Sequence, residues 1–228
     1  MATTSAPQGP TSQQKRRRKD VVLTVVTLAA VLLVCTAAGI GAFAMANSWW
    51  TEDDPVPSAD QQLADGQSRF DRAGVDFFTR QGEARIDLTS PASAADLGLD
   101  PDEASVIEPI APVALEIAGS GEATRFAGVS WFQLTTSGDR VTEVAVLPPS
   151  SGDWRGITTD LRARGAEWGW SEEQIAELET ELSDAARADD GRSHTAALPP
   201  ASVDGISVEA RVTIAASGGV ELLYVFSR

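Results

Sequence analysis

Apolar and polar positions along the chain fall into zones with different patterns. Residues 1–20 are polar and end in a basic run, whereas residues 21–46 are almost entirely apolar or small and carry no charge. From residue 58 to residue 228, apolar positions alternate with polar ones or recur at helical spacing, which is typical of elements with one buried face. The pattern predicts a disordered cytoplasmic tail, a transmembrane helix and a folded domain, with residues 47–57 as an acidic, proline-containing tether.

The run from Val21 to Ala46 has the length of a membrane-spanning helix. Its 26 residues would extend roughly 39 Å at about 1.5 Å per residue, and the hydrocarbon core of a bilayer is about 30 Å thick. The segment can therefore cross the bilayer with some tilt, and we expect it to bind lipid along its whole length.

Charges on the two sides of this run predict its orientation. Basic residues precede it and an acidic cluster, Glu52 to Asp54, follows it, so the positive-inside rule places the N-terminus in the cytoplasm. Trp49 and Trp50 stand where the helix would leave the bilayer, in the headgroup layer that indole prefers. The basic residues expected at the inner interface are Arg16, Arg17, Arg18 and Lys19. The prediction is a single-pass cell-membrane protein whose C-terminal domain is extracytoplasmic.

Two other interpretations of the apolar run stay open. The triplet Ala44-Met45-Ala46 has the small-x-small form of a signal-peptide cleavage site, although the run is longer than the usual 7 to 15 or so apolar residues. Cys35 could be acylated as in a lipoprotein, but the bulky Val34 precedes it and eleven apolar or small residues follow it. A retained anchor explains the length of the run better than either alternative.

The region from Ser58 onward is predicted to be an α+β domain with helices packed on one face of an antiparallel sheet. One helix is expected to begin at Ser58, because Gln61 has capping-box spacing, and two more at Asp153 and Ser171. The predicted strands are residues 84–88, 113–117, 126–136, 141–147, 206–215 and 220–226. The stretches 89–112 and 188–200 are expected to be irregular, apart from a helical turn near residues 92–97.

Charge and composition narrow the possible partners. The chain has a net charge of −15, and without residues 15–20 it has 13 arginines against 32 acidic residues, a net charge of −19. Such a surface repels phosphate, which excludes nucleic acid as a partner and keeps the domain away from anionic headgroups. The single cysteine lies in the apolar run, so the domain has no intramolecular disulfide. Arginine outnumbers lysine sixteen to two, which favours a bacterial envelope.

Catalytic and metal-binding patterns are weak in this sequence. His194 is the single histidine and could act as the base of a serine hydrolase, but no Gly-x-Ser-x-Gly elbow supplies a nucleophile. Zinc would need several histidine or cysteine ligands. Asp100, Asp102 and Glu103 form the densest acidic group, yet they lack the spacing of a calcium loop. We therefore expect no metal and no cofactor.

Three tryptophans gather around the predicted helical pair. Trp154 and Trp168 share helical spacing with apolar residues, which favours burial against the sheet. Trp170 precedes the second cap and lies outside the apolar stripe, so it is the candidate contact with a protein partner.

No motif in the chain identifies a family. The anchor together with the absence of catalytic patterns predicts a non-enzymatic module that interacts with a protein or envelope partner. A carboxylate-dependent envelope hydrolase and a small membrane signalling or regulatory protein remain as alternative hypotheses.

Overall fold

A computed structural model describes residues 57–188 and 191–228. The predicted tail, transmembrane helix and nearly all of the tether lie outside these residues. Among the helices that are described, none has both the length and the apolar character that a membrane crossing requires. Pro57–Arg228 is one compact unit.

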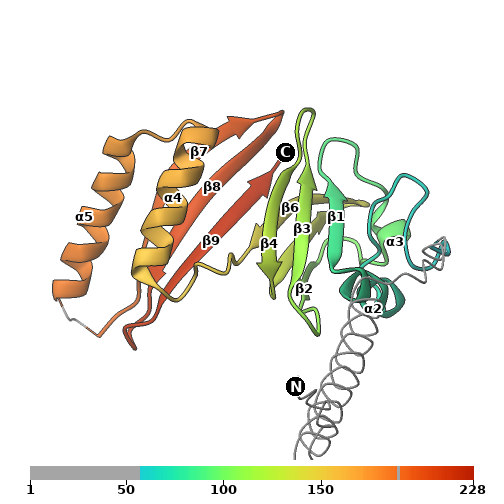
Figure 1. Cartoon of the computed structure of the whole chain (residues 1–228), viewed down its shortest axis with the longest axis horizontal. Helices are drawn as coiled ribbons and strands as arrows, with labels where there is room; N and C mark the ends of the chain where they lie inside the picture. The colour runs from blue at the N-terminus through green and yellow to red at the C-terminus, as the bar shows by residue number, and fades with distance from the viewer. Residues whose placement is uncertain (1–56, 189–190) are drawn as a thin grey trace, which may run out of the picture. The chain divides into compact units, whose positions relative to one another are not determined.

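The described strands form two sheets (Figure 1). The larger sheet is antiparallel throughout, in the order β2-β5-β6-β9-β8-β7. Its strands are β2 (Ala104–Ile107), β5 (Phe132–Ser137), β6 (Arg140–Val146), β7 (His194–Val203), β8 (Ile206–Ile214) and β9 (Val220–Ser227). The smaller sheet pairs β3 with β1 in parallel and with β4 in antiparallel orientation. Its strands are β1 (Glu83–Asp87), β3 (Val113–Ala118) and β4 (Thr124–Val129).

The helical pair forms as the sequence predicts. The described helices are α2 (Arg72–Gln81), α3 (Ala94–Leu97), α4 (Trp154–Trp168) and α5 (Glu172–Ala188). Asp153 caps α4 by accepting the Gly156 N–H at 2.8 Å, and Gly169 ends it in the left-handed conformation with φ of 82°. Ser171 and Gln174 form the predicted capping box at the start of α5, with hydrogen bonds of 2.8 and 3.2 Å.

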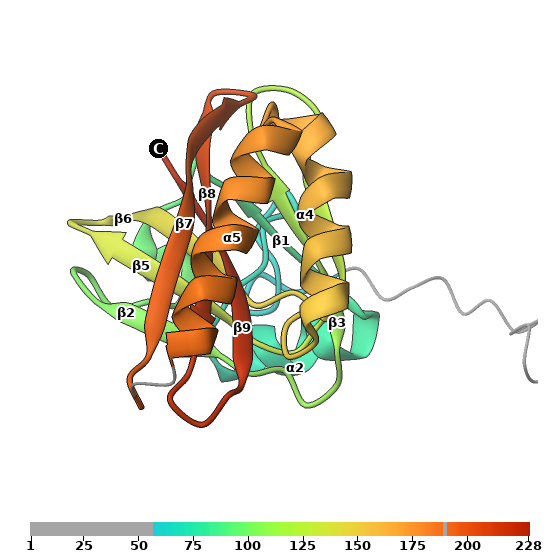
Figure 2. The same cartoon turned by 90° about the vertical axis from the view of Figure 1, so that its left-hand side faces the viewer.

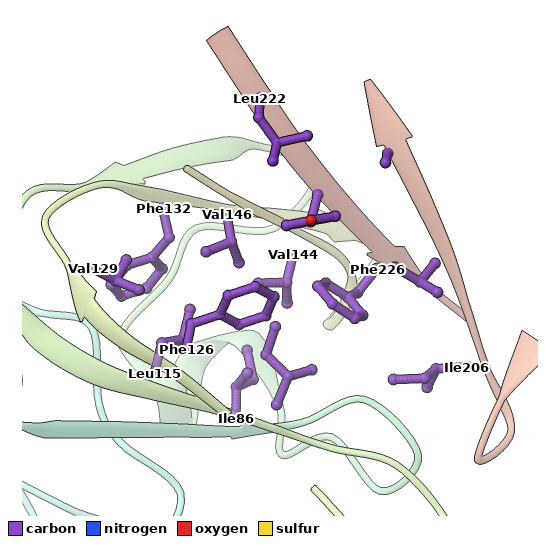
Figure 3. Close-up of a cluster of buried hydrophobic side chains, with 14 of the residues drawn as sticks. Ile86, Leu115, Phe126, Val129, Phe132, Val144, Val146, Ile206, Leu222 and Phe226 are labelled. Carbon is purple, nitrogen blue, oxygen red and sulfur yellow. The ribbon is translucent and has the colours of Figure 1, made fainter. Parts of the chain in front are cut away.

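One face of the six-stranded sheet carries the core. α4 and α5 cover it beside β7 and β8, and the three-stranded sheet covers it farther along (Figures 1 and 2). The ring of Phe126 in β4 lies 5.7 Å from that of Phe226 in β9 and 6.3 Å from that of Trp168 in α4, between ring centroids. Figure 3 shows Phe126 and Phe226 pointing toward one another in this core. The domain is thus α+β, with helices, an antiparallel six-stranded sheet and a mixed three-stranded sheet.

Several predicted elements differ from the structure. Residues 126–136 form two strands, β4 and β5, which belong to different sheets; Ser130 and Trp131 lead the chain from one sheet to the other. Both strands have alternating apolar residues, so the pattern alone does not mark the change. The single predicted sheet is consequently two sheets, and the β1–β3 pair is parallel.

The predicted helix at Ser58 is a turn. Gln61 accepts the Ser58 N–H at 3.2 Å as a capping box would, but no helix continues, and α2 starts only after Asp71 accepts the Gly74 N–H at 2.9 Å. The stretches expected to be irregular contain β2 and most of β7, because these strands pair at the sheet edges despite the prolines around or inside them. The predicted helical turn near residues 92–97 is confirmed as α3.

Candidate functional site

β2 is an edge strand of the six-stranded sheet with one described neighbour, β5. The Thr136 N–H donates to the Glu103 carbonyl oxygen at 2.8 Å on the β5 side. Hydrogen-bonding direction alternates along an antiparallel pair, so the backbone groups of Ala104 and Val106 point away from β5. No described strand pairs with that outer side, which leaves a short row of backbone donors and acceptors available.

Large apolar side chains are exposed in β2 and in the connection that follows it. Val106 in β2 is 51% exposed and Ile110 just after it is 87% exposed. Across the described part of the chain these are the large apolar side chains that stay open to water, and both belong to one short segment. Their clustering beside open backbone groups is typical of an interaction surface.

Carboxylates flank this edge. Asp100, Glu103 and Glu108 are exposed, and the ion pairs between described residues include none of them. Asp102 has a structural role, because its Oδ1 accepts the Gly138 N–H at 2.6 Å and its own φ is 55°. No group of three or more potential metal ligands occurs within residues 57–188 and 191–228. The acidic group noted in the sequence thus directly precedes β2, and Glu108 directly follows it.

The opposite edge of the sheet is protected. Pro199 and Pro200 lie inside β7 at a register shift, and neither can donate a backbone hydrogen bond. α5 also packs against β7. The two edges therefore differ in their capacity to accept a further strand.

Trp170, the predicted partner contact, is buried. It is 5% exposed, its Nε1–H donates to the Pro199 carbonyl oxygen at 2.9 Å, and its ring stacks on Tyr224 with centroids 6.4 Å apart. The expectation of an exposed side chain is corrected, because β7 supplies both cover and an acceptor for the indole. Trp168 is buried beside it, as expected for a core residue.

A charged network lies under these tryptophans. The Tyr224 hydroxyl donates to Asp160 Oδ2 at 2.8 Å, and Arg164 Nε lies 3.4 Å from Asp160 Oδ1. The guanidinium of Arg164 sits 4.0 Å from the centre of the Phe126 ring. Burial raises the pKa of Tyr224 well above its usual range, the Asp160 carboxylate raises it further, and Arg164 opposes the shift. The network joins α4 to β9.

His194 lies at the start of β7 rather than in an irregular connection. Its side chain is half-buried and lines a cavity of about 470 Å³ between α5, the β8–β9 turn and the start of α4. Trp154 lines the same cavity, which separates it from the buried pair Trp168 and Trp170. Spacing in the sequence does not bring these segments together, so the cavity follows only from the fold.

The predicted membrane-interface residues lie outside the described residues: Arg16, Arg17, Arg18, Lys19, Trp49 and Trp50. Their role stays a prediction. Comparison of the chain with protein families, with curated proteins and with solved structures finds no match.

Proposed function

We propose that this protein is a membrane-tethered, extracytoplasmic interaction module that binds an extended, basic segment of a partner protein along β2. The observation that supports it most directly is the open edge of β2, where Val106 and Ile110 are exposed beside available backbone groups. A strand added there gains backbone hydrogen bonds, and its apolar side chains cover the exposed ones.

The charge around the edge favours a basic partner. Asp100, Glu103 and Glu108 are exposed around β2, and residues 57–228 contain 13 arginines against 29 acidic residues, a net charge of −16. Lysine or arginine on the incoming strand would meet these carboxylates, whereas an acidic strand would be repelled. β2 has only four residues, so we expect a transient complex whose affinity falls with added salt.

The test uses the full chain in lipid nanodiscs and a fluorescent peptide of alternating lysine and valine, with binding followed by fluorescence anisotropy. Val106→Lys places a positive charge at the edge and should weaken binding by about tenfold or more, which is about 1.4 kcal/mol. Ala197→Lys makes the same change of charge at an exposed position of the protected edge strand β7 and should change binding less than twofold.

Two matched peptides separate the contribution of backbone hydrogen bonds from that of charge. A peptide with N-methyl groups on alternate residues keeps charge and apolarity but loses the backbone donors, and it should not bind. A glutamate–valine peptide should not bind either. Equal affinity for the methylated and unmodified peptides, or equal effects of the two lysine variants, would show that β2 does not accept a strand.

A further inference from the structure

The backbone of β2 restricts the register of a strand that pairs with its open edge. The N–H and C=O groups of Ala104 and Val106 point away from β5, whereas those of Ser105 and Ile107 point toward it. A residue of an antiparallel neighbour that lies opposite Ala104 or Val106 would therefore exchange two hydrogen bonds with β2. Every strand pair of the six-stranded sheet is antiparallel, so we expect an added strand to be antiparallel as well.

Val106 stands at the end of a row of side chains on the outer face of the six-stranded sheet, which is the face without the core. It pairs with Gln133, and Gln133 pairs with Ala145; residues directly opposite one another share a face of the sheet. The row continues from Ala145 to Val225. Ala145 and Val225 are 5% and 4% exposed, whereas Val106, with a described strand on one side only, is 51% exposed. An apolar residue opposite Val106 would extend this row and cover the valine.

Two glutamates flank β2 at unequal distances from Val106. Glu108 lies two residues after it and Glu103 three residues before it. Side chains alternate along a strand, and continuing this alternation past both ends of β2 places Glu108 on the outer face with Val106 and Glu103 on the opposite face. Both glutamates are exposed, and the ion pairs between described residues include neither. A basic residue opposite each of them would form a cross-strand pair of opposite charges.

We propose that β2 recognises a partner strand of the sequence basic-x-apolar-x-x-basic in antiparallel orientation. The apolar residue lies opposite Val106, the first basic residue opposite Glu108 and the second opposite Glu103. This inference rests on the strand addition proposed above and specifies the orientation and sequence of the added strand. The reversed sequence has no antiparallel register that meets all three residues, because with its basic residues opposite the glutamates its apolar residue faces Ser105.

The probe is a fluorescent octapeptide with blocked termini, Thr-Lys-Thr-Val-Thr-Thr-Lys-Thr. Its matched control has the same residues in reverse order, Thr-Lys-Thr-Thr-Val-Thr-Lys-Thr, and therefore the same charge and composition. Binding to the full chain in lipid nanodiscs is followed by fluorescence anisotropy. The first peptide should bind about threefold more tightly than the reversed one, or better, because it alone places valine opposite Val106 in the antiparallel register.

Charge reversal locates the first lysine of the probe. Glu108→Lys should weaken binding of the probe by about threefold or more, and this variant should instead prefer a peptide with glutamate in place of the first lysine. Glu177→Lys is the matched control, since it makes the same charge change at an exposed position of α5, which packs against β7 at the other edge of the sheet. It should change binding less than about twofold and keep the preference for lysine. Unfolding midpoints show whether each variant is folded.

The outcomes separate the register from strand addition itself. Equal affinity for the two octapeptides, tighter binding of the reversed one, or a preference for lysine that persists in Glu108→Lys would overturn the proposed register. So would binding of the lysine–valine peptide by a protein that binds neither octapeptide. In each of these cases strand addition at β2 could still hold. Strand addition fails in a different way, through equal affinity for N-methylated and unmodified peptides, and the register proposal then fails with it.

Discussion

Raising the pH above about 10 should destabilise this domain through its single tyrosine. Tyr224 is fully buried, and its hydroxyl donates to the Asp160 carboxylate at 2.8 Å. Burial, followed by the neighbouring negative charge, raises its pKa above the usual value of about 10. In the folded domain the phenol therefore stays neutral at a pH where the same residue ionises in the unfolded chain.

The sign of the effect follows from proton linkage. A pKa that is raised by folding contributes stability that is fully present below the unfolded pKa and is lost as the pH rises above it. Each pH unit above about 10 should lower the free energy of unfolding by about 1.4 kcal/mol. Two units would remove roughly 2.7 kcal/mol, a large share of the 5 to 15 or so kcal/mol typical of a domain.

The assay follows two signals from one sample of the full chain in detergent micelles. The tyrosinate absorbance reports ionisation of Tyr224 alone, since the chain has one tyrosine, and far-ultraviolet circular dichroism reports folding. Both signals should change together, well above pH 10. Tyr224→Phe should abolish the absorbance change and remove the extra alkaline loss of stability. At neutral pH the same variant should cost about 1.5 to 3 kcal/mol, because Asp160 loses a hydrogen bond. Tyrosinate absorbance that appears near pH 10 with unchanged circular dichroism would refute the reasoning.

Two further predictions address packing and topology. A Cβ atom at Gly119 would lie 2.7 Å from the Asp204 carbonyl oxygen, so Gly119→Ala should cost about 1 to 3 kcal/mol in urea denaturation. At Gly219 the nearest atom to an added Cβ is Ser217 Oγ, 3.9 Å away, so Gly219→Ala should cost less than about 1 kcal/mol. Equal costs of the two variants would contradict the role of the Gly119–Asp204 contact. With Cys35 replaced by serine, a membrane-impermeant maleimide added to intact cells should label Ser202→Cys but not Ser5→Cys. Labelling of Ser5→Cys but not of Ser202→Cys would show that the orientation is opposite to the predicted one.

Local signals in the sequence predicted the helical pair well. The caps at Asp153 and Ser171 depend on hydrogen bonds across three residues, so their spacing is visible in the sequence. The hairpin of β8 and β9 was equally clear, because alternating strands flank a glycine-rich turn.

Features that depend on distant pairing were not predictable in the same way. Trp170 is buried because its indole meets the Pro199 carbonyl, 29 residues farther along the chain. β2 has four residues and lies between prolines, so only its pairing with β5 reveals it as a strand. The cavity beside His194 combines segments from α4, α5 and the strands β7 to β9, and no motif spans such separations.

The position of β9 has a consequence for the order of synthesis and folding. It follows every other described strand in the sequence, yet it lies inside the six-stranded sheet, with β6 on one side and β8 on the other. Without β9, no strand pairing joins the β7–β8 hairpin to the β2-β5-β6 part of the sheet. Because the ribosome makes the N-terminus first, this sheet cannot be complete until Ser227 has left the ribosome.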